Sequence, residues 1–140
     1  MKSRPFWFYN QSGVIPYRVN QSKMEVLLIT SRRRGRWIIP KGVIDPGTKA
    51  VESASKEAYE EAGIRGRVSS QPLGNYQYRK WGGICTVQVF ALEVLDVLET
   101  WPESSFRRRQ WIGVEQAANA VEELALKKLI LRISPAKPPS

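Results

Sequence analysis

The chain has 140 residues, 42% of them hydrophobic and 25% charged, and this length and composition predict one globular domain with a sizeable core. No apolar run approaches the roughly 20 residues that span a bilayer, and the N-terminal apolar stretch is too short for a secretory signal, so we expect a soluble cytoplasmic protein that does not bind membranes. The net charge of +9 favours an anionic partner, while the absence of histidine and the single cysteine exclude His-based catalysis, disulfides within the chain and cysteine-rich zinc sites.

The first half of the chain predicts short strands that lead into one helix. Strands are expected where short apolar or branched runs occur, at residues 13–19, 24–30 and 37–39. Pro40 ends the last of these strands, and a turn rich in Pro and Gly follows. A helix is then predicted over residues 49–62, because small apolar side chains recur along one face. Thr48 is placed to cap this helix and Gly63 to stop it.

The second half of the chain predicts a hairpin followed by helices. Two long β segments, a short strand and two helical patterns are expected in this order, at residues 68–80, 84–98, 110–114, 114–120 and 121–133. Residues 81–83 contain two glycines and predict the hairpin turn. The proline-rich residues 134–140 are expected to form an extended, flexible tail. This order of elements predicts a single α/β domain over residues 1–140, with a mixed sheet packed against helices.

The predicted helix is unusually acidic for a basic chain. Glu57, Glu60 and Glu61 lie three or four residues apart or adjacent, so their carboxylates are close together on the helix surface. Like charges at this spacing cost about a few tenths of a kcal/mol each, and a bound divalent cation would reverse that sign. Because the chain lacks histidine, such a site must be built from oxygen, which favours magnesium or manganese. The alternative is a solvated acidic face with Lys56 as a local partner.

The residues around this helix resemble the Nudix box. The family pattern is Gly, five residues, Glu, seven residues, then Arg-Glu-U-x-Glu-Glu-x-Gly-U, where U is apolar. The positions that match it at the correct spacing are Gly42, Glu57, Ala58, Glu60, Glu61, Gly63 and Ile64. Two positions depart from it, because Thr48 stands in place of the first Glu and Lys56 in place of the Arg. The resemblance covers most of the chain, from about residue 13 to residue 133.

The resemblance implies a Nudix-type α/β/α sandwich with a mixed β-sheet and a catalytic loop-helix-loop. The reaction it implies is hydrolysis of a phosphoanhydride by water, with Glu57, Glu60 and Glu61 as ligands of magnesium, or alternatively of manganese. One of these carboxylates, or one from a later loop, would orient or deprotonate the water. In family members the box Arg holds the first Glu of its triplet, whereas Lys56 keeps the charge but loses the bidentate fork. Thr48 removes a carboxylate, which leaves the number of bound ions open.

The sequences on either side of the box are similar to the branch of the family that hydrolyses diphosphoinositol polyphosphates and diadenosine polyphosphates. This looser match is carried by residues 36–42, 93–103 and 109–111. Within it, Glu103 follows Trp101 and Pro102 in a loop after a long strand, where catalytic residues often lie. We therefore identify Glu103 as a further candidate catalytic residue. The alternative is an exposed loop charge near the basic cluster at residues 107–109.

A basic loop precedes the acidic helix and is a candidate phosphate-binding site. It contains Arg32, Arg33, Arg34 and Arg36. Guanidinium groups hold phosphates by paired, charge-assisted hydrogen bonds. We predict that a polyphosphate substrate is bound by Arg32, Arg34, Arg36, Lys41 and Gly42. The alternative is a charged loop that only improves solubility, and at least one of the arginines is expected to face solvent because the loop is short.

The sequence leaves three functions open. The first is hydrolysis of a highly phosphorylated small molecule of the diadenosine polyphosphate or diphosphoinositol polyphosphate type. The second is hydrolysis at the 5′ end of RNA, which the charge of +9 suits equally, although nucleic acid is the less favoured partner. The third is a degenerate Nudix domain that binds nucleotide or nucleic acid without turnover, as the departures at Thr48 and Lys56 allow. The natural substrate and the oligomeric state stay open.

Overall fold

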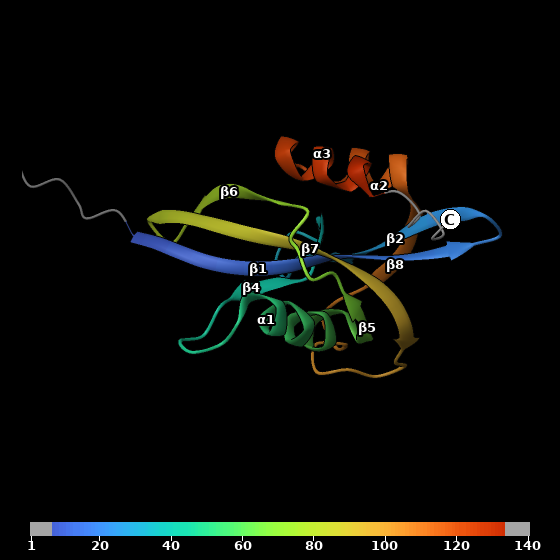
Figure 1. Cartoon of the computed structure of the whole chain (residues 1–140), viewed down its shortest axis with the longest axis horizontal. Coiled ribbons are helices and arrows are strands. Elements are labelled where there is room, and N and C mark those ends of the chain that lie inside the picture. The colour runs from blue at the N-terminus through green and yellow to red at the C-terminus, as the bar shows by residue number, and fades with distance from the viewer. Residues whose placement is uncertain (1–6, 134–140) are drawn as a thin grey trace, which may run out of the picture.

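The computed structural model describes residues 7–133 and joins eight strands in one sheet (Figure 1). The strands are β1 Trp7–Asn20, β2 Lys23–Thr30, β3 Trp37–Ile38, β4 Lys41–Val43, β5 Ile64–Val68, β6 Gly74–Lys80, β7 Gly83–Val97 and β8 Arg109–Gly113. Their order is β3-β2-β1-β7-β5, with β4 also beside β1, β6 beside β7 and β8 beside β2. The pair β1–β7 is parallel and the other pairs are antiparallel, which confirms the predicted mixed sheet.

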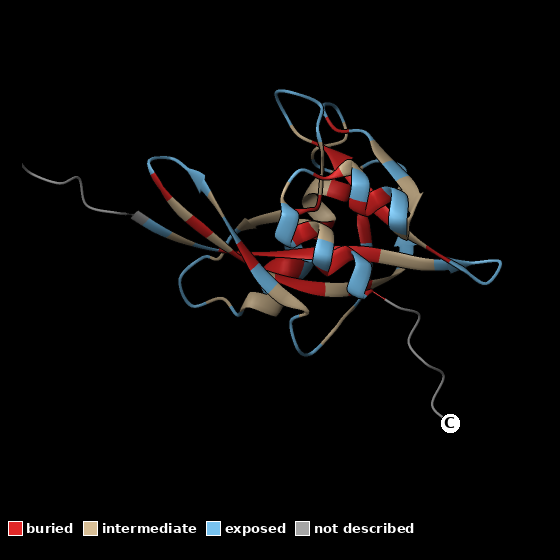
Figure 2. Cartoon of the chain, turned by 90° about the horizontal axis from the view of Figure 1, so that it is seen from above, coloured by how far each residue is buried: buried red, intermediate tan, exposed pale blue. Residues whose placement is uncertain are grey.

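Two long strands determine how the sheet branches. On one side, β1 runs beside β7 from Trp7 to Tyr17. On its other side β1 pairs first with β4 and then with β2, and β7 likewise pairs first with β6 and then with β5. The sheet therefore divides at both central strands. One branch, made of β6, the start of β7 and the start of β1, extends beyond the helices (Figures 1 and 2).

The helices are α1 Ala50–Glu57, the π-helical turn η1 Ala58–Ala62, α2 Val114–Ala120 and α3 Leu124–Arg132. The first two lie on one face of the sheet, and α2 and α3 lie on the other (Figure 1). Each face has its own apolar core, which contains Ala54, Ala58 and Ala62 on the first side and Leu126 and Ile130 on the second. This packing confirms the α/β/α sandwich. Among the helices of residues 7–133, none is long and apolar enough to cross a membrane.

The predicted turn between β6 and β7 is confirmed. Trp81 and Gly82 connect the two strands, and Lys80 pairs with Gly83 across the turn. Both central residues have positive φ, 54° and 69°, as tight two-residue turns between twisted strands require. Gly82 adopts this conformation without steric cost, whereas Trp81 is a bulky residue held in it by the hairpin.

The acidic helix differs from the continuous α-helix predicted over residues 49–62. Its α-helical part ends at Glu57, and the next five residues form the π-helical turn η1. The N–H of Gly63 donates to the carbonyls both four and five residues earlier, and Gly63 ends the helix in the left-handed conformation, as predicted. A π turn changes the direction of the side chains it carries, so Glu60 and Glu61 do not project at α-helical spacing.

Other local predictions are corrected by the structure. Thr48 does not cap α1, because Lys49 occupies the N-cap position and no side chain bonds to the helix there. The segment 68–80 is not one strand, because Pro72 interrupts it and separates β5 from β6. The short strand β4 was not predicted, since its residues follow a proline and include a glycine. The expected tail at residues 134–140 lies outside the described residues.

Substitution of Gly63 by alanine tests how tightly the end of the acidic helix is packed. A Cβ at this position would lie 2.7 Å from atoms of Arg109 and Trp101, in addition to the cost of a left-handed conformation. Gly35 has nearly the same φ, and a Cβ added there would meet no atom within 4 Å, so Gly35→Ala should lose only the conformational cost of about 1–2 kcal/mol. We expect Gly63→Ala to lower the free energy of unfolding by about 1–3 kcal/mol more, measured by urea denaturation. Equal losses would contradict a tight enclosure.

Candidate active site

The acidic helix meets the sheet where β4 passes next to Glu57. Gly42 is the central residue of β4 and pairs with Ser12 of β1. A Cβ added to Gly42 would overlap the carboxylate of Glu57. Only glycine therefore leaves room for this carboxylate against the strand. Gly42 forms the floor of a cradle for one of the predicted metal-binding groups.

Glu61 lies deeper than Glu57, with 12% of its side chain exposed. Its Oε1 accepts a hydrogen bond from the backbone N–H of Lys41 at 3.0 Å, and its Oε2 lies 3.5 Å from Nη2 of Arg107. These contacts hold the carboxylate between β4 and the loop that follows β7. Glu57 and Glu61 therefore approach neighbouring residues of the same short strand.

A buried arginine connects the candidate acidic residues. The side chain of Arg107 is 6% exposed, and its Nε donates to Oε1 of Glu103 at 2.7 Å. Its Nη1 donates to the carbonyl of Thr30 at 2.8 Å, and Nη2 completes the ion pair with Glu61. Glu103 is therefore joined to Glu61 through one guanidinium group. Glu103 lies near the basic cluster at residues 107–109, as the alternative expected, but it is partly buried, with 26% of its side chain exposed, and its carboxylate is bound by Arg107.

The loop after β7 also fixes the backbone of the π turn. The indole Nε1 of Trp101 donates to the carbonyl of Glu61 at 2.9 Å, and Nη1 of Arg109 donates to the carbonyl of Ala62 at 2.7 Å. The Arg109 guanidinium lies 3.9 Å from the centre of the Trp101 ring and also donates to the carbonyl of Leu98. Carbonyls that the helix end leaves unpaired are thus satisfied by side chains from a distant segment.

Glu60 lies nearer to solvent than Glu61, with 35% of its side chain exposed. Lys56 Nζ is 3.9 Å from Glu60 Oε1 and 3.5 Å from Asp45 Oδ2. Lys56, which stands in place of the box Arg, therefore pairs with Glu60 and Asp45. The resemblance implies that this position holds Glu57, and Lys56 forms no ion pair with Glu57. Within the described part of the chain, Glu57 forms no ion pair with a lysine or arginine.

Burial changes the acid strength of two of these carboxyls. It raises the pKa of Glu57 to about 7, and the neighbouring Glu60 carboxylate adds to this increase. Burial also raises the pKa of Glu61 to about 7, against the opposing effects of Arg107 and the Lys41 N–H. Carboxyls with such pKa values hold protons readily at neutral pH and release them when a cation binds.

These carboxylates fit a divalent cation in their chemistry. All the donors are hard oxygen atoms, and Gly42 leaves Glu57 the space of a missing side chain. In the side-chain positions of residues 7–133, no three acidic groups converge as a ready-made cation site. The assignment of Glu57, Glu60 and Glu61 as metal ligands stays a prediction, and so does a catalytic role for Glu103.

The arginines of the basic loop are exposed and have different neighbours. Arg36 forms an ion pair with Glu122 in the connection between α2 and α3. The guanidinium of Arg32 lies 4.4 Å from the centre of the Phe106 ring, next to the loop that carries the buried arginine. The other two arginines of the loop are exposed as well, which agrees with the expectation that at least one faces solvent.

Lys41 lies apart from these arginines, between the carboxylates and the β6–β7 hairpin. Its Nζ is 5.3 Å from the centre of the Tyr78 ring, and the Tyr78 hydroxyl donates to Oε1 of Gln11 at 2.7 Å. Burial lowers the pKa of Lys41, and the Glu61 carboxylate opposes this change. Among the described residues its ammonium group forms no ion pair.

Sequence reasoning missed the residues that hold the acidic helix in place. Residues 107–109 were identified only as a basic cluster, yet Arg107 binds the candidate carboxylates and Arg109 binds the end of the helix. The spacing of Glu103 and Arg107, four residues apart, is a signal that could have indicated the first contact. Nothing in the sequence indicates that Trp101 donates to the helix backbone, because its partner lies in another segment.

The fold and the site define a class of α/β domain in which an acidic helix, preceded by a glycine-containing strand, packs on a mixed sheet. The chain belongs to the Nudix family, since the NUDIX domain matches residues 10–133. This match confirms the resemblance that the box residues carry. It includes the acidic helix, β4 and the loop that holds the buried arginine.

Relatives agree with this membership, and a solved structure shares the fold. Nudix hydrolase 13, mitochondrial, of Arabidopsis thaliana is 36% identical over 128 residues, which cover 76% of this chain and 63% of that protein. The chain thus spans slightly less than two thirds of this relative. Diphosphoinositol polyphosphate phosphohydrolase 3-beta of Bos taurus is 30% identical over 120 residues, covering 84% of this chain and 72% of that protein. A C. elegans Ap4A hydrolase binary complex has the same fold, with a TM-score of 0.76 at 24% identity over 88% of this chain and 93% of that chain.

The raised pKa of Glu57 predicts a pH dependence of stability without metal. Between its ordinary value of 4.5 and about 7, the folded protein binds this proton more tightly than the unfolded chain does. The free energy of unfolding should therefore fall as the pH rises from about 5 to about 8. In urea denaturation with a chelator, Glu57→Gln should reduce this fall, whereas Glu52→Gln on the exposed face of α1 should not. The same pH dependence in all three proteins would contradict the raised pKa.

Proposed function

We propose that the chain is a metal-dependent Nudix pyrophosphohydrolase that cleaves a phosphoanhydride bond in a highly phosphorylated small molecule. The observation that carries this proposal is the placement of the partly buried Glu57 and Glu61 against β4, with Glu103 joined to Glu61 through Arg107. The diphosphoinositol polyphosphate phosphohydrolase and Ap4A hydrolase among the similar proteins support a substrate with a chain of phosphates. The basic charge of the chain supports the same class of substrate.

Glu57, Glu60 and Glu61 would hold the divalent cation, for which we propose magnesium with manganese as the alternative. A bound cation supplies neutralisation of the phosphoanhydride charge and lowers the pKa of a water molecule. The chain itself orients Glu61 through the Lys41 N–H, and Gly42 allows Glu57 to lie against β4. Lys56 reduces the repulsion at Glu60.

Water is the proposed nucleophile. The chain has no histidine, and its one cysteine, Cys85, is buried. A carboxyl with a pKa near 7 is matched to accept a proton from water at neutral pH, which makes Glu57 and Glu61 candidates for that role. Glu103 is a further candidate, held by Arg107 at the edge of the same group.

The phosphate chain of the substrate is proposed to bind Lys41 and the basic loop. The backbone N–H of Lys41 binds Glu61, its ammonium group forms no ion pair among the described residues, and Arg32 and Arg34 are exposed. Arg36 would have to exchange its partner Glu122 for phosphate. This exchange is inexpensive, because exposed ion pairs contribute about 0–1 kcal/mol.

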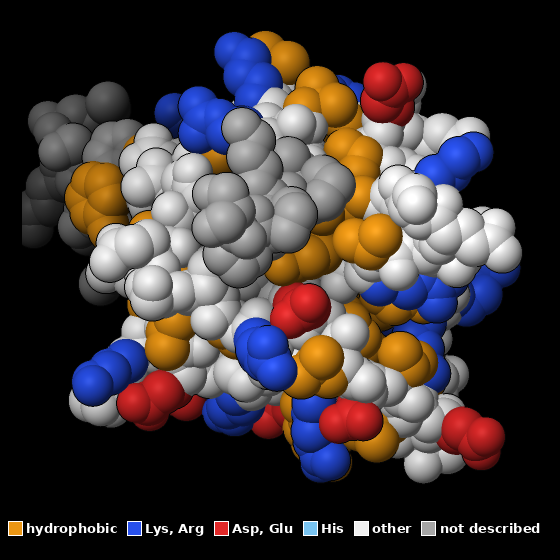
Figure 3. Space-filling view, turned by 45° about the vertical axis from the view of Figure 1, so that its right-hand side comes forward, with side chains coloured by type: hydrophobic (Ala, Val, Ile, Leu, Met, Phe, Trp, Pro, Cys, Tyr) orange, Lys and Arg blue, Asp and Glu red, His pale blue; other side chains and the backbone are white. Residues whose placement is uncertain are grey.

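Two other functions have some support. Hydrolysis at the 5′ end of RNA also fits a basic chain, but on the face drawn in Figure 3 the Lys and Arg side chains lie among Asp and Glu and form no continuous basic surface. A domain that binds without turnover fits the departures at Thr48 and Lys56. Against it, the chain retains the three box carboxylates Glu57, Glu60 and Glu61, which binding alone does not need.

Glu60 provides the sharpest test of the proposed metal site. Its carboxylate is partly exposed and only loosely paired, so Glu60→Gln should leave the free energy of unfolding nearly unchanged. With magnesium and diadenosine tetraphosphate, we expect kcat/KM to fall by about 100-fold or more, as for other lost charge-stabilising groups. Glu52→Gln removes the same charge from the exposed face of α1 and should keep full activity. Full activity of Glu60→Gln, or hydrolysis by the unaltered protein in excess chelator, would refute the metal site.

The basic loop should matter more as the phosphate chain lengthens. Each charge-assisted hydrogen bond is worth about 1.5–3 kcal/mol, and a longer chain can engage more guanidinium groups. The double variant Arg32→Ala/Arg34→Ala should therefore raise KM for diadenosine hexaphosphate by at least about tenfold, and much less for a nucleoside diphosphate sugar. Lys23→Ala/Lys128→Ala, at exposed sites elsewhere, removes the same net charge as a control. Equal changes for both substrates, or none, would support a loop that serves only solubility.

A further inference from the structure

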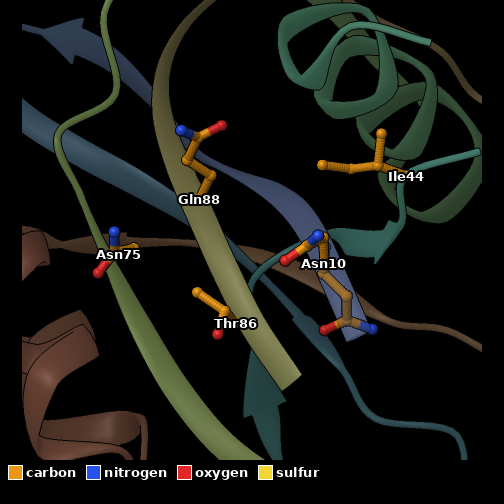
Figure 4. Close-up of a pocket in the computed structure, with 6 residues that line it drawn as sticks. Asn10, Ile44, Asn75, Thr86 and Gln88 are labelled. Carbon is orange, nitrogen blue, oxygen red and sulfur yellow. The ribbon is translucent and has the colours of Figure 1, made fainter. Parts of the chain in front are cut away.

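A pocket of about 280 Å³ lies on the branch of the sheet that extends beyond α1 (Figure 4). Its lining side chains come from β1, β6 and β7 and from the residue after β4, and they are Asn10, Gln11, Ile44, Asn75, Thr86 and Gln88. The volume is close to the lower limit of ligand pockets, which span roughly 300–1,000 Å³. The pocket therefore has room for one ring-sized group, not for a large ligand.

The polar side chains of this pocket belong to a regular grid on one face of the sheet. Alternate residues of a strand share a face, and this face is apolar at Val14 and Phe90, where it lies in the core with α1. Further along the same strands it becomes polar. Strand pairing aligns two rows there, Asn10–Thr86–Gln77 and Ser12–Gln88–Asn75. The grid contains no charged residue, although the chain as a whole carries a net charge of +9.

The carboxamides of the grid have unused hydrogen-bonding groups. In the described part of the chain, Asn10, Asn75 and Gln88 make no side-chain hydrogen bond, while Gln77 donates to Thr86. Each carboxamide can donate two hydrogen bonds and accept others. Ser12, in the row Ser12–Gln88–Asn75, is fully buried, and its hydroxyl has no hydrogen-bond partner among the described residues. The three carboxamides that line the pocket, Asn10, Asn75 and Gln88, are matched to a neutral, polar ligand.

The row Ser12–Gln88–Asn75 of the grid lies next to the proposed metal-binding group. Ser12 pairs with Gly42 on one side and with Gln88 on the other, and Gly42 lies against the Glu57 carboxylate on the same face of the sheet. Two strand spacings, roughly 10 Å, therefore separate Gln88 from the strand next to Glu57. A substrate whose phosphates lie at Glu57 can place the group attached to them over the grid.

The chemistry of the grid distinguishes between the two classes of phosphate substrate. A carboxamide can form a pair of hydrogen bonds with the edge of a nucleobase, as Asn and Gln do with adenine. A phosphorylated cyclitol would instead place charged groups against side chains that cannot neutralise them, at a cost in desolvation. No Lys or Arg lines the pocket. The grid therefore suits an uncharged base much better than a ring that carries phosphates.

We propose that the pocket lined by Asn10, Asn75 and Gln88 binds the nucleobase of a nucleoside polyphosphate, and that this chain acts on dinucleoside polyphosphates in preference to diphosphoinositol polyphosphates. This inference rests on the proposed function, because it assigns the part of the substrate next to the reacting phosphates. It assigns a recognition role to residues that lie outside the Nudix box.

The test compares substrates and a variant that keeps the volume of the side chain. We expect the unaltered protein to hydrolyse diadenosine tetraphosphate with a kcat/KM at least tenfold above that for a diphosphoinositol pentakisphosphate. Gln88→Leu should raise KM for diadenosine tetraphosphate at least fivefold more than KM for inorganic tripolyphosphate, which has no base. Gln110→Leu, on the exposed side of β8, is the matched control and should change neither KM.

The outcomes separate this inference from the proposed function. Efficient hydrolysis of the inositol substrate with an equal effect of Gln88→Leu on both KM values would overturn the base pocket and leave the hydrolase intact. If no substrate is hydrolysed, the proposed function fails, and the base pocket is then tested by ligand binding instead of by kinetics. In that case, adenosine 5′-diphosphate with magnesium should shift the side-chain amide NMR signals of Asn10, Asn75 and Gln88, while pyrophosphate should not. Identical responses to the two ligands would overturn the pocket.

Discussion

The arrangement of the acidic helix depends on one buried guanidinium group. Arg107 reaches Glu61, Glu103 and the carbonyl of Thr30 at once, and so connects η1, the loop after β7 and the end of β2. A buried charge is stable only when its partners are present, and removing one partner of such a pair typically costs about 3–5 kcal/mol. The position of Glu61 against β4 is therefore as much a property of the later loop as of the helix itself.

Much of the fold could be predicted because the relevant signals are local. The apolar run that ends at Thr30, the small residues of the acidic helix and the glycines at the β6–β7 turn each indicate their structure within a few residues. The end of the acidic helix at Gly63 is likewise indicated by the glycine itself. The spacing of the box carboxylates is a local signal as well, although the π turn that carries Glu60 and Glu61 changes how they project, and their role as metal ligands stays a prediction.

The remaining features depend on contacts between distant segments. The change from α to π geometry after Glu57 is stabilised by hydrogen bonds from Trp101 and Arg109, and neither residue is near the helix in sequence. The different roles of neighbouring arginines could not be predicted either, because burial alone distinguishes Arg107 from the exposed Arg108. The polar grid likewise exists only because three strands align alternate residues on one face.

The parallel pairing of β1 with β7 has a consequence for the biogenesis of the protein. Trp7 pairs with Gly83, so the two central strands can join only after β7 has been synthesised. Pairing between such distant segments carries a large loop-closure entropy and folds slowly. β1 and β2 are adjacent in the chain and can pair before β7 is synthesised, whereas the other edge of β1 stays open until β7 emerges. The strand at the centre of the finished sheet is thus an edge strand in the nascent chain, at the stage when edges are most prone to misassociation.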